Sequence, residues 1–131
     1  MLSDPNSEPV PALSVLLVED EVVIRALLAE ELRSHGLTVV EASNADEAWA
    51  YLQTGGAADL VFSDVTMPGS MNGVELVRRV KVEYPATKAI LTSGNPGTDN
   101  IEALGLFLLK PFRLFAAAAA TLQSLGMKGA P

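Results

Sequence analysis

Acidic side chains gather at two points where an apolar run gives way to polar sequence. Glu19 and Asp20 follow the run Val15 to Val18, and Asp64 follows the run that begins at Leu60. Clustered carboxylates repel one another unless a cation joins them. Oxygen ligands without His or Cys suit a hard cation, and Mg2+ is the ion we expect. A carboxylate left free beside such an ion is a known nucleophile toward phosphorus.

Hydroxyl and ammonium groups follow two further apolar runs. Thr92 and Ser93 come after Ala89 to Leu91, and Lys110 comes after Leu106 to Leu109. An ammonium pairs with a phosphoryl oxygen through a charge-assisted hydrogen bond, and a hydroxyl can donate to another oxygen. Together with the carboxylates, these groups indicate chemistry on a phosphoryl group, provided that the fold brings them to one place.

The order of the elements meets that condition. Apolar strand-like runs alternate with segments of helical spacing, which predicts an α/β fold with a parallel sheet. In such sheets ligands sit beyond the carboxyl ends of the strands. The expected strands are Val15 to Val18, Thr38 to Glu41 at a sheet edge, Leu60 to Phe62, Ala89 to Leu91 and Leu106 to Leu109.

Helical spacing follows each strand. Asn44 and Glu47 form the pattern of a capping box that opens the second helix. Pro85 marks the end of the third helix, which carries Leu76, Val77 and Val80. A short, weak helix is expected at about Thr98 to Leu104. The apolar residues that recur at helical spacing are Ile24, Leu27, Leu28 and Leu32 in the first helix, Ala45, Ala48 and Leu52 on one face of the second, and Leu76, Val77 and Val80 in the third. We expect the last helix to bury Phe115, Ala118, Leu122 and Leu125.

Length and composition narrow the class of protein. The chain of 131 residues suffices for one domain, which we place at residues 13–126, between a Pro-rich leader, 1–12, and a tail, 127–131. Cysteine is absent, so disulfides and thiolate metal sites are excluded. No apolar stretch is long enough to span a membrane and no signal peptide is visible, so we expect a cytoplasmic protein without a membrane partner. The net charge of −7 argues against nucleic-acid binding.

Four segments carry a resemblance to a known family. They are residues 15–21 (VLLVEDE), 63–73 (SDVTMPGSMNG), 90–94 (ILTSG) and 109–112 (LKPF). In this order, at the ends of the expected strands, they resemble the receiver domain of bacterial two-component response regulators, of the CheY-like superfamily and single-domain type. The resemblance implies a doubly wound, flavodoxin-like (βα)5 fold whose five-stranded parallel sheet has the order 2-1-3-4-5, with helices on both faces and a short fourth helix.

The resemblance also implies a role for each matching residue. Asp64 would accept a phosphoryl group from a histidine kinase or a histidine phosphotransfer protein, with Mg2+ as cofactor, and the domain would catalyse only its own phosphorylation and dephosphorylation. The signal would pass to a downstream protein through the face formed by the fourth helix, fifth strand and fifth helix. The implied roles are Asp20, Asp64, the Thr66 carbonyl and Glu19 for the metal, Lys110 for the phosphoryl group, Ser93 as the moving hydroxyl, Phe107 as the aromatic that follows it, and Lys110–Pro111 as a candidate cis bond.

Two segments depart from the family pattern. The loop Pro68 to Gly73 is one residue longer than the commonest form, and Asn95 to Leu106 leaves little room for the fourth helix. Single residues also have simpler explanations. Glu19 and Asp20 would suit a solvated first helical turn, Phe107 would suit core packing, and Thr92 is an alternative to Ser93 because strand alternation lets only one of them face the site.

Four other functions stay open on the sequence. A phosphate sink or shuttle in a multistep phosphorelay would use the same residues. A Mg2+-dependent phosphatase of the haloacid-dehalogenase type would need its aspartate after the first strand and an acid in place of Thr66. A flavodoxin-like cofactor binder would need a Gly-, Ser- or Thr-rich loop after the first strand, where Glu19 to Glu21 stand. A receiver fold kept only for protein contacts would not need the acidic residues.

Overall fold

The chain forms one parallel sheet of five strands in the order β2-β1-β3-β4-β5. The computed structural model describes residues 12–94 and 101–127. The predicted strands are confirmed, each within two residues of its expected ends. Their bounds are β1 Ser14–Val18, β2 Thr38–Ala42, β3 Leu60–Asp64, β4 Lys88–Ser93 and β5 Leu106–Leu109.

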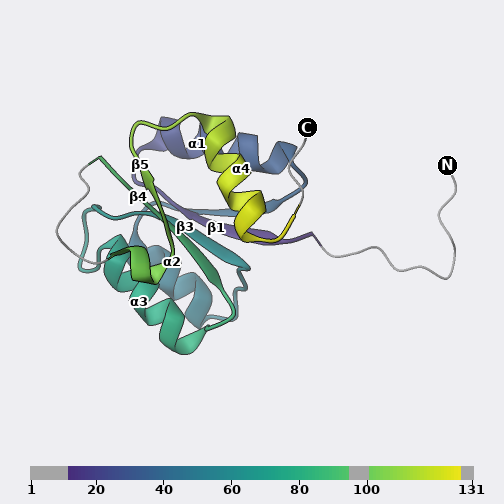
Figure 1. Cartoon of the computed structure of the whole chain (residues 1–131). Helices are drawn as coiled ribbons and strands as arrows, with labels where there is room; N and C mark the ends of the chain where they lie inside the picture. Colours follow the sequence, from purple (N-terminus) through teal and green to yellow (C-terminus); the bar gives the residue numbers. More distant parts are fainter. Residues whose placement is uncertain (1–11, 95–100, 128–131) are drawn as a thin grey trace, which may run out of the picture.

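Helices cover both faces of this sheet, as predicted (Figure 1). Helices α1 and α4 pack together on one face, while α2 and α3 lie on the other, with a short 3-10 turn, η1, beside α3. The bounds are α1 Val22–Ser34, α2 Ala45–Gln53, α3 Gly73–Glu83, η1 Ile101–Leu104 and α4 Leu114–Ser124. This is the doubly wound arrangement, and it places every strand's carboxyl end at the same edge of the sheet.

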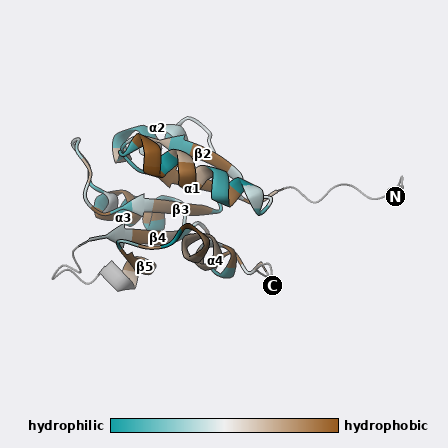
Figure 2. Cartoon of the chain, turned by 90° about the horizontal axis from the view of Figure 1, so that it is seen from above, coloured by the Kyte–Doolittle hydropathy of each residue, from teal (hydrophilic) through white to brown (hydrophobic). Residues whose placement is uncertain are grey.

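The central strands β1 and β3 are buried because helices cover both faces of the sheet. All five residues of β3 are buried, as are the last four of β1. Alternate positions serve opposite cores: Val15 and Leu17 pack toward α1 and α4, and Leu16 and Val18 pack toward α2 and α3. In Figure 2 most of the α4 ribbon has the hydrophobic colour, whereas the α1 ribbon alternates between hydrophobic and hydrophilic residues. The carboxyl ends of these strands, which carry the predicted polar groups, are therefore supported by buried apolar residues.

Two details of the helices differ from the sequence prediction. The fourth helix is only the 3-10 turn Ile101–Leu104, and the predicted residues 98–100 lie outside the described residues. Phe115 was expected in the core but is 66% exposed. In α4 nearly every residue is apolar, so the sequence does not mark the inward stripe, and the buried positions are Ala117, Ala118, Thr121 and Leu122. Leader residues 1–11 and tail residues 128–131 also lie outside the described part.

The register between neighbouring strands aligns the polar residues that were predicted to form the site. Val18 pairs with Ser63, Asp64 with Thr92, and Ser93 with Leu109. Residues Glu19, Asp64, Ser93 and Lys110 therefore occur at or just past the same edge of four adjacent strands. Within the described residues, none of the helices combines the length and apolar character needed to cross a bilayer.

Candidate functional site

Asp64 is the last residue of β3 and lies at the centre of the site. Its neighbours in the chain hold its backbone in the sheet: Val65 N donates to Thr92 O at 2.8 Å, and Gly73 N returns to donate to Val65 O at 3.0 Å. The residue is 9% exposed. The fold thus presents one carboxyl group at the sheet edge while burying the strand that carries it.

Two further carboxylates approach Asp64 from the loop after β1. Glu19, Asp20 and Asp64 each offer an oxygen atom, and these atoms lie within 4.8 Å of one another. Glu19 is buried, with its side chain accepting from Glu21 N at 3.1 Å, whereas Asp20 is exposed. The donor set fits Mg2+, since all ligands are hard oxygens and one carboxylate faces solvent, from which a hydrated ion arrives. The sequence prediction that residues 19, 20 and 64 meet is confirmed in the structure.

Lys110 closes the cluster from the end of β5. Its Nζ donates to Asp64 Oδ2 at 2.8 Å and to Glu19 Oε1 at 3.3 Å. Lys110 N also donates to Ser93 O at 2.8 Å, so the backbone of β4 positions this residue. The Lys110–Pro111 bond is cis, which confirms the sequence prediction. Lys110 binds only the Oδ2 atom of Asp64, and the other carboxylate oxygen, Oδ1, accepts a hydrogen bond from Thr66 N at 3.3 Å.

Burial and charge act against each other in this cluster. Burial raises the pKa of the Glu19 carboxyl above its usual range, although the Glu21 amide and Lys110 partly oppose this. Burial also disfavours the charged form of Lys110, but its hydrogen bond to Asp64 and the charges of Asp64 and Glu19 outweigh that, so the pKa of Lys110 is raised. An ammonium that stays protonated beside two carboxylates is suited to hold a third anionic group.

The two hydroxyl candidates lie on opposite faces of β4. Ile90 belongs to the core under α1 and α4, whereas Leu91 belongs to a smaller cluster with Val74, Val77 and Ala89, against which Phe107 packs. Strand alternation therefore puts Ser93 on the face of Leu91 and Phe107, and Thr92 on the other face. Both residues are buried, Thr92 being 1% and Ser93 6% exposed. Phe107 is half-buried.

The loop after Asp64 contains a contact that the sequence did not predict. Ser70 in this loop binds the side chain of Asp46, in the first turn of α2. An acid at that position has an ordinary explanation in the helix dipole, so no sequence pattern distinguishes the contact. Gly73, which the resemblance had matched, has a clear reason: an added Cβ would collide with the Asp64 carbonyl oxygen and lie 2.8 Å from Ser63 Oγ.

Apolar side chains surround the mouth of the site. A pocket of about 240 Å3 lies between α1 and the segment after β5, and Lys110 forms part of its wall beside Ile24, Leu27 and Phe112. Among the lining residues, Leu27 is 48% exposed, and large apolar side chains near the lining residues in the chain are also exposed: Val22, 66%; Val23, 70%; and Phe115, 66%. The cluster of charges is thus bordered by a surface that a protein could cover.

Residues 15–115 match the family model described as the response regulator receiver domain. Response regulator GtcR of Aneurinibacillus migulanus is 33% identical over 110 residues, which cover 81% of this chain and 45% of GtcR. Sensor kinase CckA of Brucella abortus is 38% identical over 118 residues, which cover 86% of this chain and 12% of CckA.

A solved structure agrees with both the fold and the family. Response regulator TrrA of Thermotoga maritima, crystallised with Mg2+ and BeF, superposes with a TM-score of 0.75 at 29% identity and covers 86% of this chain and 98% of that chain. The curated relatives are longer than the match, since this chain spans less than half of GtcR and a smaller part of CckA.

Proposed function

The chain belongs to the response-regulator receiver family of two-component signalling, and we propose that its Asp64 accepts a phosphoryl group from a phosphohistidine donor. The observation that carries this proposal is the position of Asp64, whose carboxylate lies 2.8 Å from Lys110 Nζ and within 4.8 Å of the carboxylates of Glu19 and Asp20. One nucleophile, one cation and a set of oxygen ligands meet at a single point.

Asp20 and Asp64, with the Thr66 carbonyl and Glu19, would hold Mg2+ at this site. A bound Mg2+ supplies charge neutralisation for the phosphoryl oxygens. The chain's own groups do the rest. A carboxylate oxygen of Asp64 attacks phosphorus in line, the bond from phosphorus to the donor's imidazole nitrogen breaks, and the donor keeps its electron pair. Lys110 moves from the Asp64 carboxylate to an equatorial phosphoryl oxygen.

The donor would dock on the apolar surface at the mouth of the site. Leu27, which is 48% exposed, lines the pocket that Lys110 helps to form. Val22 and Val23 of the same helix, and Phe115 next to the lining residue Leu114, are also exposed. Large exposed apolar patches mark protein contact. A histidine kinase or a histidine phosphotransfer protein that covers this surface would reach Asp64 and exclude water from the reacting atoms. As in other receivers, the expected compartment is the cytoplasm.

Phosphorylation would then change the side of the molecule that carries Ser93 and Phe107. Ser93 moves toward the new phosphoryl group, and Phe107, on the same face of the sheet, turns into the space released. Leu106 and Leu109 of β5 are 45% and 53% exposed, so a downstream protein bound to β5 would contact residues that shift. A two-state surface biased by a covalent group is how such a change passes on. Thr92 would act instead of Ser93 only from the opposite face.

Labelling with acetyl phosphate in the presence of Mg2+ tests the acceptor. The wild-type chain should become labelled, and Asp64→Asn should abolish labelling. Asp59→Asn is the matched control, because Asp59 stands at the opposite end of β3 and binds Ser14 N at 2.7 Å. It should be labelled like the wild type. Labelling of Asp64→Asn at the wild-type level would refute the assignment.

A relay intermediate is the second candidate, and the similarity to a segment of sensor kinase CckA favours it. An intermediate passes its phosphoryl group back to a histidine, whereas a terminal regulator keeps it or hydrolyses it. Incubating the labelled chain with a histidine phosphotransfer protein separates the two roles, because rapid loss of label to that protein identifies the intermediate.

A further inference from the structure

We propose that Asp46 of α2 is a positioning residue for the acceptor site, holding in place the loop that carries Thr66. Its carboxylate makes two hydrogen bonds to one loop residue: Ser70 Oγ donates to Oδ1 at 2.6 Å, and Ser70 N donates to Oδ2 at 3.1 Å. Charge-assisted bonds from a hydroxyl and an amide to one carboxylate fix both distance and direction. This inference rests on the proposed function, since it concerns the metal ligands of the same site.

The loop is shaped around that carboxylate. Gly69 has a φ of +122°, which disfavours any residue with a side chain, and a Cβ there would lie 2.8 Å from Asp46 Oδ2. On either side of it, Met67 and Met71 are buried in the same cluster as Ala45 and Ala48 of α2. The segment from Met67 to Met71 is therefore held against the first turn of α2.

The held loop leads directly to the site. Thr66 precedes the buried Met67, and Thr66 N lies 3.3 Å from Asp64 Oδ1. The Thr66 carbonyl is the expected third protein ligand of the metal. If Ser70 is released from Asp46, the backbone between Thr66 and Gly73 loses the two hydrogen bonds that Ser70 makes to the first turn of α2. The carbonyl then samples more positions, which weakens the binding of a cation.

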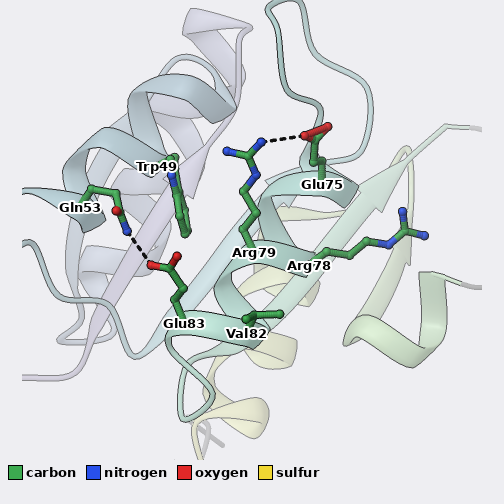
Figure 3. Close-up of a pocket in the computed structure, with 7 residues that line it drawn as sticks. All are labelled: Trp49, Gln53, Glu75, Arg78, Arg79, Val82 and Glu83. Atoms are coloured by element: carbon green, nitrogen blue, oxygen red, sulfur yellow. Dashed lines mark hydrogen bonds and ion pairs between the residues drawn. The ribbon is translucent and has the colours of Figure 1, made fainter.

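Helix α2 is anchored independently at its other end, so it can serve as a fixed support. Gln53 Nε2 donates to Glu83 Oε2 at 2.9 Å and to the Tyr84 hydroxyl at 3.0 Å. Figure 3 shows the Gln53–Glu83 contact across the groove between α2 and α3, with Trp49 on the α2 side and Arg79 facing it. The Arg79 guanidinium lies 5.8 Å from the Trp49 ring centroid. Loss of the Asp46 contact therefore leaves α2 docked and affects the loop selectively.

Glu47 provides a matched control in the same helical turn. It is also acidic and also lies in the first turn of α2. Its carboxylate accepts from Ser43 N at 3.2 Å and from Ser43 Oγ at 2.9 Å, on the β2 side of the helix start. Replacing either acid removes one negative charge from the helix N-terminus, but only Asp46 binds the loop. A difference between the two variants thus isolates the loop contact from the helix dipole.

The test measures metal affinity and loop order without the phosphorylation reaction. Mg2+ is titrated into the metal-free wild type, Asp46→Ala, Glu47→Ala and Ser70→Ala, and the amide resonances near Asp64 are followed. We expect the Kd for Mg2+ to rise about fivefold in Asp46→Ala, below the roughly 10–100-fold cost of losing a direct outer-shell partner. Ser70→Ala keeps the amide bond and should show a smaller rise, and Glu47→Ala should match the wild type.

Hydrogen exchange of the Ser70 amide in the metal-free protein gives a second readout. It should accelerate in Asp46→Ala and stay unchanged in Glu47→Ala, while the thermal midpoint shows that each variant is folded. An equal Kd for Asp46→Ala and wild type, or an equal rise in Glu47→Ala, would overturn the positioning role. If the wild type itself does not bind Mg2+, the proposed function fails, and the exchange result still reports on the contact.

Discussion

The two sides of the site differ in how tightly they are packed. The acceptor side, which comprises the ends of β1 and β3 and residues 65–72, sits on strands with no exposed position and is bound to α2. The response side, which comprises the end of β4, η1 and β5, has an edge strand without a buried residue. The proposed attack on phosphorus needs groups held in fixed positions, whereas a change of shape needs a part of the fold with few packing contacts.

The hydrophobic clusters under the two sides reflect the same division. Met67 and Met71 of the acceptor side join a large core that includes β1, α2 and α3. Phe107 of the response side packs on a small cluster of Val74, Val77, Ala89 and Leu91. Rearranging Phe107 therefore disturbs little of the core, and the following experiments test whether the two sides differ as the packing indicates.

The largest expected effect comes from adding one methyl group to each side. Gly73→Ala places a Cβ against the backbone carbonyl of Asp64 and should lower the free energy of unfolding by about 3 kcal/mol, as overpacking of a closed site does. Gly94→Ala on the response side meets nothing within 4 Å and should change it by less than about 0.5 kcal/mol. Urea unfolding measures both, and equal losses would break the comparison.

A smaller effect of opposite sign should follow from removing one charge of the acidic cluster. In metal-free buffer, Asp20→Asn should raise the free energy of unfolding by about 1 kcal/mol, because it relieves repulsion among carboxylates within 4.8 Å of one another. The same variant should lose the stabilisation that Mg2+ gives the wild type.

Glu30→Gln is the control for Asp20→Asn, since Glu30 is an exposed acid on α1 outside the cluster. It should leave both the metal-free stability and the Mg2+ response unchanged. If Asp20→Asn is less stable than the wild type without metal, the acceptor side does not hold repelling charges ready for a cation, and that part of the comparison is wrong.

The smallest expected effect is a dependence on acid. The hydrogen bond from the Ser70 hydroxyl lowers the pKa of Asp46 below its usual 3.8, with the Ser70 and Met71 amides and the charge of Arg79 acting in the same direction. A lowered carboxyl pKa stabilises the fold above the unfolded value and loses that contribution as pH falls through the folded value. The stability difference between wild type and Asp46→Ala should therefore shrink below pH 3.8, as measured by urea unfolding. A constant difference would contradict this.

The sequence sufficed to predict the strands and the meeting of the charged groups. Buried parallel strands appear in a sequence as short apolar runs, and the polar residues at their carboxyl ends lie at one edge of the sheet. The sequence alone therefore predicted that residues 19, 20, 64 and 110 lie close together. Three features could not be predicted. An acid at position 46 has an equally good explanation in the helix dipole, and Phe115 lies in a helix that has no clear polar face to show which side points inward. In the capping-box pattern the Glu47 side chain would accept from Asn44 N, but it accepts from Ser43 instead, because the path of the chain into α2 brings Ser43 closer.

A crystal structure with Mg2+ and beryllofluoride tests the central claim most directly. We predict one beryllofluoride on Asp64, Lys110 Nζ on one of its fluorine atoms, and the ion among Asp20, Asp64 and the Thr66 carbonyl. The acceptor side should stay in place, while Ser93 and Phe107 move. Beryllofluoride bound elsewhere, or an ion that Asp20 and Asp64 do not share, would contradict the account.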